Sequence, residues 1–463
     1  MTTPVPSLAD ASRAIAAGTL SPVELTEQAL ARIAALDPSL HAFIEVTAPR
    51  ARTAAQAAEA EIKAGRRRGP LHGIPYALKD IYDAAGLRTT CHSRQMLQNM
   101  ADTDAETTAR LEAAGMVLLG KLSTHEFARG GPTDELAFPN AKNPWDVTRF
   151  AGGSSSGSGT AVASGMVAMA MGSDTGGSIR LPASYCGIVG LKATYGRISR
   201  RGVFPLSFTL DHAGPLARTV EDCALTTQVL AGHDPLDPGS ADEPVPDYMA
   251  QIDAGIAGLV IGRARAFDIE SGVDAETMTA LDAACEVLRG LGATIIDVTL
   301  PARARTDAVT QAVLLAEGFA IHADWLRRTP ELYGRVTRER LMMGAFVSGA
   351  DYVQAQRLRR VLIAEMDAVF ARCDAVLCAG TPSAAPLLSE VDEGPFRKSH
   401  PITSTFNATG HPAIALPCGF GANGMPLSLS FAAGSFHEAL LFRVAHAYER
   451  AAGWWEQRPP LAV

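Results

Sequence analysis

Apolar residues recur at helical spacing close to the start of the chain. Ser21 can cap a helix whose first position is Pro22, and Glu24 completes a capping box. The apolar positions that follow every three or four residues are Leu25, Ala29, Ile33 and Leu36. A second, alanine-rich helix is predicted over residues 50–64. The pattern therefore predicts a helical opening to the chain.

The pattern changes after residue 70, where short apolar runs begin to alternate with helical segments. Buried strands are predicted over 72–80 and 116–122, with a helix over 104–115 between them. Further helices are predicted over 159–170, 218–231, 274–290 and 351–372, and further strands over 258–262, 293–298, 374–378 and 413–417. The alternation predicts an α/β fold with a mainly parallel sheet. Residues 232–248, acidic and rich in proline, are predicted to form a surface loop.

The composition is typical of a globular protein. The chain has 463 residues, of which 47% are hydrophobic and 19% charged, enough for one large domain or a few smaller ones. A net charge of −8 argues against a nucleic-acid-binding protein, because such a surface would be basic. The tight basic run at residues 65–69 is predicted to be a solvated loop.

The sequence carries no pattern typical of a metal site, a disulfide framework or a membrane span. The seven cysteines are scattered without a CxxC pair, as in proteins with reduced cytosolic thiols. The N-terminus lacks the basic and apolar regions of a signal peptide. The apolar part of residues 159–178 is shorter than the roughly 20 residues that span a bilayer, which favours a buried core helix. We expect a cytoplasmic protein without a metal or another cofactor.

Gly and Ser occupy every position of residues 152–159, a run that several kinds of site could explain. A phosphate-binding loop has the glycine spacing of residues 152–157, but it needs a lysine where Ser158 stands. A hydrolase elbow would make Ser155 the nucleophile, but no apolar strand precedes the run. A flexible linker would mark a domain boundary, whereas a second Gly/Ser cluster follows at residues 176–178. Two such clusters around one buried helix indicate a shared site.

Three long motifs resemble the amidase signature family. They are "HGIPYALKD" at 72–80, "GGSSSGS" at 152–158 and "GSDTGGSIRLPASYCGIVGLKATYGRISRRG" at 172–202, and the resemblance continues to "HPAIALPCGF" and "LLFRVAHAYE" near the C-terminus. The resemblance implies an α/β fold with a large mixed, twisted sheet covered by helices on both faces. It also implies one domain over residues 1–463, with a helical segment (1–65), a signature core (66–231) and a remainder with the substrate pocket (232–463).

The resemblance implies a catalytic triad of two serines and a lysine. The lysine of the first motif is Lys79, the first serine of "GGSSSGS" is Ser154, with a cis peptide, and the serine of "DTGGSIR" is the nucleophile Ser178. A serine hydroxyl needs a base, and a lysine acts as a base only when it is neutral, which burial favours. The apolar neighbours of Lys79 fit such burial. The proton would pass from Ser178 through Ser154 to Lys79.

The resemblance also implies binding groups around the nucleophile. The oxyanion of the acyl-transfer intermediate would be bound by backbone N–H groups, those of Thr175, Gly176, Gly177 and Ser178. The candidates for the substrate pocket are Ala128, Arg129, Gly130 and Ser155. Scaffold roles are expected for Asp174, Arg180, His72 and His212, because this triad needs no histidine.

Two enzymatic functions stay open within the family. One is a stand-alone hydrolase of small amides, anilides or carbamates, which binds no membrane and no nucleic acid directly and for which a homodimer stays open. The other is the glutaminase component of a tRNA-dependent amidotransferase, its A subunit, which passes ammonia to partner subunits. We favour the stand-alone hydrolase, because the segment expected to hold an acid for the amino group of glutamine carries Lys398, Ser399 and His400 instead. A non-catalytic binding protein is a third alternative, and the intact triad argues against it.

The region over residues 300–405 is the least regular part of the sequence. Its large apolar residues are predicted to be core or, alternatively, the wall of an apolar acyl or aryl site: Trp325, Tyr333, Met342, Met343 and Phe346. Arg340 matches a basic position of the amidotransferase glutaminase, and we expect it to be an exposed helical arginine.

Overall fold

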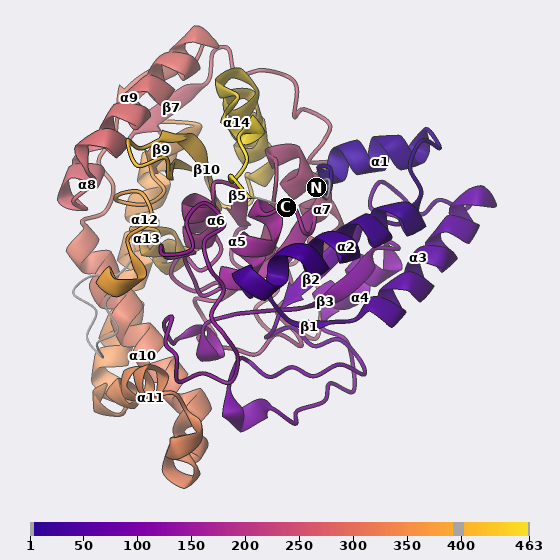
Figure 1. The fold of residues 1–463 in the computed structure, drawn as a ribbon. Helices are drawn as coiled ribbons and strands as arrows, with labels where there is room; N and C mark the ends of the chain where they lie inside the picture. Colours follow the sequence, from indigo (N-terminus) through magenta and orange to yellow (C-terminus); the bar gives the residue numbers. More distant parts are fainter. Residues whose placement is uncertain (1–3, 392–401, 462–463) are drawn as a thin grey trace.

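The computed structural model describes residues 4–391 and 402–461. Its strands are β1 Phe43–Val46, β2 Pro75–Lys79, β3 Val117–Leu122, β4 Met169–Asp174, β5 Val189–Lys192, β6 His212–Ala217, β7 Val260–Arg263, β8 Thr294–Asp297, β9 Ala375–Ala379, β10 Ala413–Phe420 and β11 Pro426–Ala432. They form one 11-stranded sheet in the order β1-β3-β2-β4-β6-β5-β10-β11-β9-β7-β8. Strands from both halves of the sequence thus share one framework (Figure 1).

The sheet is mixed, and the mainly parallel sheet predicted from the alternation of elements is wrong. Strand β2 runs parallel to β3 and β4, and β7 runs parallel to β8 and β9. The other strand pairings are antiparallel. Antiparallel neighbours need no helical crossover, as the short connection between β10 and β11 shows. The mixed sheet that the family resemblance implies is confirmed.

The first helices form where the apolar pattern predicts them. Helix α2 (Pro22–Leu40) begins after Ser21, whose hydroxyl accepts a hydrogen bond from the N–H of Glu24. Helix α3 (Ala48–Lys63) follows β1, and α4 (Glu106–Ala113) connects β2 to β3. One further helix, α1 (Leu8–Ala16), precedes them and packs on α7 (Val220–Leu230).

The predicted helix over residues 159–170 is wrong in its second half. Helix α5 (Ser156–Ala163) ends early, Gly165 takes a positive φ of 70°, and β4 begins at Met169. Strand β4 is buried along its whole length between β2 and β6. Small apolar residues suit a buried helix and a central strand equally well, so pairing with both neighbours decided the outcome.

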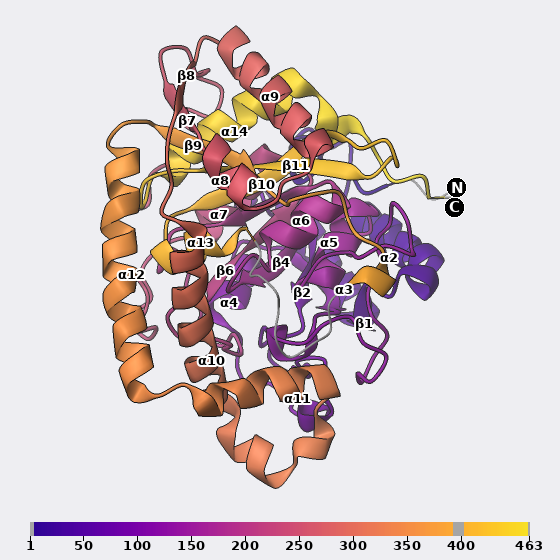
Figure 2. The same ribbon diagram turned by 90° about the vertical axis from the view of Figure 1, so that its left-hand side faces the viewer.

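Helices cover both faces of the sheet. Helix α6 (Arg180–Cys186) packs with α5 on one face, while α9 (Ala275–Gly290) packs with α14 (Glu438–Ala452) on the other. Figure 2 shows these two pairs on opposite sides of β11. No described helix is both long and apolar enough to cross a bilayer.

A group of helices from the second half lies beside the sheet. It consists of α10 (Arg303–Arg328), α11 (Arg335–Met342), α12 (Gly349–Phe370) and α13 (Ser404–Thr409). The short helix α8 (Arg265–Glu270) precedes this group in the sequence and directly follows β7. Helix α10 packs against the other three (Figures 1 and 2). Residues 232–248 form the predicted loop, with turns but no helix or strand.

Candidate active site

The candidate site lies where the parallel strands β2 and β4 end. Lys79 is the last residue of β2, and its ammonium group lies 2.6 Å from the hydroxyl of Ser154 and 2.8 Å from that of Ser173. Ser154 stands just before α5, and Ser173 lies near the end of β4. Carboxyl ends of parallel strands are common places for binding sites, because loops from several strands converge there. The fold thus brings the predicted Lys79 and Ser154 into direct contact.

Lys79 is completely buried, and this changes its chemistry. Burial lowers the pKa of its ammonium group to about 7, while the carboxylates of Asp211 and Asp174 partly oppose that shift. The two groups that accept its hydrogen bonds are hydroxyls and not carboxylates. A substantial fraction of Lys79 is therefore neutral near pH 7, as a general base must be.

Ser178 is half-buried and faces a small cavity of about 40 Å³. The cavity is lined by His125, Ala128, Arg129, Gly130, Gly153, Ser154, Thr175, Gly176, Ser178, Leu181, Leu206 and Leu314. Within the described chain, the hydroxyl of Ser178 has no hydrogen bond, including none to Ser154. The predicted nucleophile and the predicted relay thus share one cavity, with the Ser178 hydroxyl available to a ligand.

The backbone around Ser154 is held from two sides. The Gly153–Ser154 peptide bond is cis, as the resemblance implies, and the carbonyl of Ser154 accepts hydrogen bonds from the N–H of His125 and the hydroxyl of Thr124. A side chain at position 153 would overlap the His125 ring, since its Cβ would lie 2.1 Å from a ring carbon. Glycine is therefore required beside Ser154.

Ser155, predicted to line the pocket, lies elsewhere. It is completely buried, and its hydroxyl donates to the carbonyl of Ser173 and accepts from the N–H of the same residue. It lines neither of the two cavities at this site. Its hydroxyl instead joins the Gly/Ser run to β4, because the backbone at the start of α5 turns it away from the cavity and toward the strand.

Asp174 organises the turn that carries Ser178. Its carboxylate accepts hydrogen bonds from the N–H groups of Gly177 and Ile179 and from the side chains of Arg180 and Asn407. Burial opposes ionisation of Asp174, but Arg180 and Asn407 outweigh it and hold the pKa of the carboxyl below its usual range. The scaffold position expected for Asp174 and Arg180 agrees with these contacts.

The same turn presents the predicted oxyanion donors. The N–H of Gly177 donates to Asp174 at 2.7 Å, so it is already in use. The N–H groups of Thr175, Gly176 and Ser178 make no hydrogen bond within the described chain, and all three residues line the small cavity. An added Cβ at position 177 would lie 2.0 Å from the Thr403 hydroxyl, so glycine is needed there for packing.

Ala128, Arg129 and Gly130, which were expected to line the substrate pocket, form one wall of the small cavity. Ala128 takes a positive φ of 56°, which turns the chain sharply after the 3-10 turn Glu126–Ala128. The carbonyls of residues 129 and 130 accept hydrogen bonds from Arg340. Arg340 is 1% exposed, so the exposed position predicted for it is wrong. The tertiary fold packs α11 against this wall, which helical periodicity alone does not reveal.

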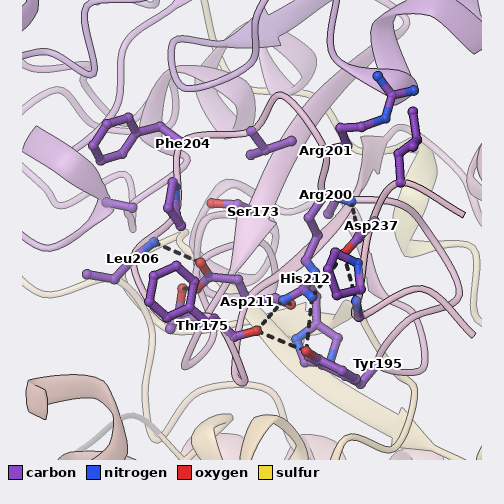
Figure 3. A pocket seen from close by; sticks show the side chains of 18 residues that line it. Ser173, Thr175, Tyr195, Arg200, Arg201, Phe204, Leu206, Asp211, His212 and Asp237 are labelled. Carbon is purple, nitrogen blue, oxygen red and sulfur yellow. Dashed lines mark hydrogen bonds and ion pairs between the residues drawn. The ribbon is translucent and has the colours of Figure 1, made fainter. Parts of the chain in front are cut away.

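A second cavity of about 380 Å³ adjoins the small one through Ala128, Thr175 and Leu206. Figure 3 shows its wall, which includes Ser173, Asp211 and a group of apolar side chains, Val203, Phe204, Pro205, Leu206, Phe208 and Leu236. Arg200 stacks over the Tyr195 ring at 4.6 Å and contacts Asp237. Sequence patterns did not reveal this cavity, because residues 236–239 come from a loop whose polar composition gave no sign of a binding role.

The aromatic and methionine candidates predicted from the sequence lie away from both cavities. Phe127 packs against Trp325 and Tyr333 in an aromatic cluster, whereas Met342 and Phe346 are exposed. Met343, which follows α11, lines neither cavity, and Lys398, Ser399 and His400 lie outside the described residues. His212 lines the large cavity, but its ring nitrogen Nδ1 contacts the carbonyls of Asp174 and Leu210. His72 is buried beside Gly115.

The described residues contain no group of three or more His, Cys, Asp or Glu side chains placed to hold a metal ion. All seven cysteines are buried free thiols, and burial raises the pKa of those at 91, 186, 223, 285, 373, 378 and 418.

Comparison with known proteins agrees with this geometry. The amidase family profile matches residues 24–442. The chain is 39% identical to the A subunit of glutamyl-tRNA(Gln) amidotransferase from Roseiflexus sp. (strain RS-1), over 99% of this chain and 98% of that protein. A solved chain from a vestigial protein complex, described as revealing the evolutionary origins of an s-triazine catabolic enzyme, superposes with a TM-score of 0.91 at 35% identity, covering 96% of this chain and 98% of that one. The peptide amidase of Stenotrophomonas maltophilia gives a TM-score of 0.87 at 32% identity, with 98% of both chains covered. The chain belongs to the amidase signature family, whose members are hydrolases that act on C–N bonds.

Proposed function

We propose that the protein cleaves an amide C–N bond through an acyl-enzyme on Ser178. The Oγ of Ser178 attacks the carbonyl carbon, its proton passes to Ser154, and Ser154 gives its own proton to neutral Lys79. The C–N bond then breaks, and the leaving nitrogen takes the proton back along the same path. Water next attacks the ester, supplies the acid's hydroxyl and returns a proton to Ser178. The observation that carries this proposal is the 2.6 Å contact between Lys79 and Ser154 beside a cavity shared with Ser178.

The free N–H groups of Thr175, Gly176 and Ser178 would stabilise the oxyanion that forms during both attacks. Loss of one such donor typically lowers kcat by about 10²–10³-fold. These donors are backbone N–H groups, so the conformation of the turn sets the direction in which they point. The hydrogen bonds to Asp174 fix that conformation.

Glutamine is the substrate that we place first, with ammonia as the leaving group. The support is the similarity to glutamyl-tRNA(Gln) amidotransferase A subunits along nearly the whole chain. On this proposal the protein works with partner subunits that consume the ammonia. This reverses the preference for a stand-alone hydrolase that the sequence favoured, because that preference rested on a single short segment.

A stand-alone hydrolase of apolar amides, anilides or carbamates is the second candidate. It is supported by the apolar wall of the 380 Å³ cavity, which a glutamine side chain does not need. The absence of an acidic residue among positions 398–400 supports it as well. Each candidate thus rests on a different observation.

A substrate panel tests both candidates. Purified protein and its Ser178→Ala variant are assayed with glutamine, a short aliphatic amide, an anilide and an aryl carbamate, with and without candidate partner subunits. Glutamine turnover that rises with the partners supports the amidotransferase function. Turnover of the anilide or carbamate without glutaminase activity under either condition supports the stand-alone hydrolase.

A fluorophosphonate probe tests the nucleophile separately. Labelling should be lost in Ser178→Ala and kept in Ser155→Ala. The opposite pattern would contradict the assignment of Ser178. A wild-type protein that reacts with the probe but, when assayed without the probe, hydrolyses no compound in the panel would contradict the two substrate proposals.

A further inference from the structure

Three arginines line one cavity that shares no residue with the candidate active site, where the two ends of the described chain meet. The cavity has a volume of about 200 Å³, and its arginines are Arg32, Arg218 and Arg458. Its other lining residues come from residues 4–6, from the end of α5 and the segment that follows it (162–168), and from Pro459 and Leu461. The first and last described residues of the chain therefore lie side by side at this cavity.

No acidic residue lines this cavity in the described chain. Arg32 and Arg218 are 6% and 4% exposed, so two guanidinium groups are nearly removed from water. Burial lowers the pKa of Arg32, and burial followed by the charge of Arg32 lowers the pKa of Arg458 to about 10. Asp10 opposes the shift of Arg458, but its carboxylate is already paired with Arg13 at 2.8 Å.

Arg218 is the arginine that gives the strongest evidence for a ligand. Its Nη2 donates to the carbonyl of Gln457, while its Nε and Nη1 are buried without any hydrogen-bond partner in the described chain. A buried guanidinium with unpaired N–H groups is unfavourable unless an acceptor joins it. A guanidinium presents its N–H groups in a planar fork that suits two oxygens of one anion.

We propose that this cavity binds a small oxyanion, with Arg218 as its central ligand and Arg458 beside it. The shared chemistry is a compact anion with at least two acceptor oxygens, such as phosphate or a carboxylate. Bound there, the anion accepts hydrogen bonds from the unpaired N–H groups of Arg218 and ties the first and last described segments to the residues that precede β4. The N–H of Val5 donates a hydrogen bond to the carbonyl of Gly165, and both residues line the cavity.

Thermal unfolding of the full-length protein tests the site, with inorganic phosphate or acetate compared with chloride at equal ionic strength. We expect phosphate, acetate or both to raise the Tm of the wild type by several degrees, because a ligand that binds only the folded state stabilises it. A response to phosphate alone identifies a phosphate ligand, and a response to acetate alone identifies a carboxylate ligand. Hydrogen exchange of the Val5 amide should become slower in the presence of the anion that raises the Tm.

Three variants separate the site from general salt effects. Arg218→Gln should lose most of the rise in Tm, and Arg458→Gln, at the more open side of the cavity, should lose part of it even if the first variant folds poorly. Arg265→Gln is the matched control, since Arg265 pairs with Asp282 at 2.5 Å outside this cavity and should keep the full rise. An equal rise in Tm in all variants would overturn the proposal. So would a wild type whose Tm rises with neither anion and which shows no heat of anion binding in isothermal titration calorimetry.

Discussion

Two buried lysines on neighbouring strands, Lys79 at the end of β2 and Lys121 near the end of β3, have opposite surroundings. Both are at most 1% exposed. Lys121 lies 2.9 Å from the carboxylate of Asp80, whereas Lys79, among the described residues, hydrogen-bonds only to the hydroxyls of Ser154 and Ser173. The carboxylate compensates the charge of Lys121, and Lys79 has no such counterion in contact. Burial alone therefore does not make a base, because the partner decides whether the charge is retained.

The chain places Asp80 directly after Lys79, yet the two do not pair. Successive side chains of an extended segment point to opposite sides, so Asp80 turns away from Lys79 and toward Lys121 and Thr90. An ion pair between sequence neighbours is the simplest expectation from the sequence, and the strand geometry excludes it. The separation keeps an acid out of direct contact with the proposed base.

The largest effect should come from replacing Lys79. Lys79→Met removes the proton acceptor but leaves no unpaired carboxylate, so kcat/KM should fall about 10⁴-fold or more while the Tm changes little. Steady-state kinetics and thermal unfolding of the same preparation measure both quantities. Activity within about tenfold of the wild type would contradict the role of Lys79 as the base.

Lys121→Met should show the reverse pattern. It leaves the Asp80 carboxylate buried without its ammonium partner, so the free energy of unfolding should fall by about 3–5 kcal/mol. The folded fraction should keep most of its kcat, because Lys121 does not contact the triad. Denaturant unfolding measures the loss, and adding Asp80→Asn should restore part of it. A Lys121→Met variant as stable as the wild type would show that the ion pair does not matter.

The pH dependence should report Lys79 alone. Neutral Lys79 becomes scarcer as the pH falls, so kcat/KM should drop about tenfold for each pH unit below its pKa of about 7 and level off above it. The unfolded chain binds this proton up to about pH 10.5, so the stability of the wild type relative to Lys79→Met should rise between pH 7 and 10.5. A pH–rate profile that is flat down to about pH 5 would contradict a lysine base.

The smallest effect should come from the hydroxyl partners. Ser173→Ala removes an acceptor that favours the charged form of Lys79, so the acid limb of the pH–rate profile should move to lower pH, with about a tenfold loss in kcat/KM. Thr89→Val is the matched control, since it removes a hydroxyl 3.1 Å from Lys121. In the Thr89→Val control, the acid limb of the pH–rate profile should stay at the same pH. An equal shift of that limb in both variants would contradict the specific role of Ser173.

Much of the site could be predicted because its residues lie within long motifs. The resemblance named Lys79, Ser154 and Ser178, and the structure places Lys79 in contact with Ser154 beside a cavity lined by Ser154, Ser178 and residues 128–130. Their catalytic roles stay a proposal. Ser173 was missed as a partner of Lys79, because no strand was predicted over residues 171–174 and the register of β4 beside β2 was therefore unknown. Arg340 was misplaced because burial of a helical face depends on what packs against it.

The sequence by itself determined which reactive residue types this protein has, the spacing of the two Gly/Ser clusters, and the family to which they belong. Alternation along the extended chain also separates Lys79 from Asp80. Only the tertiary structure decided the partners: it set β2 between β3 and β4, so that Asp80 pairs with Lys121 and two hydroxyls face Lys79. Pairing of strands distant in sequence fixes these contacts, and the protonation state of a buried amine depends on them, because it reflects the groups within a few ångströms and not the neighbours along the chain.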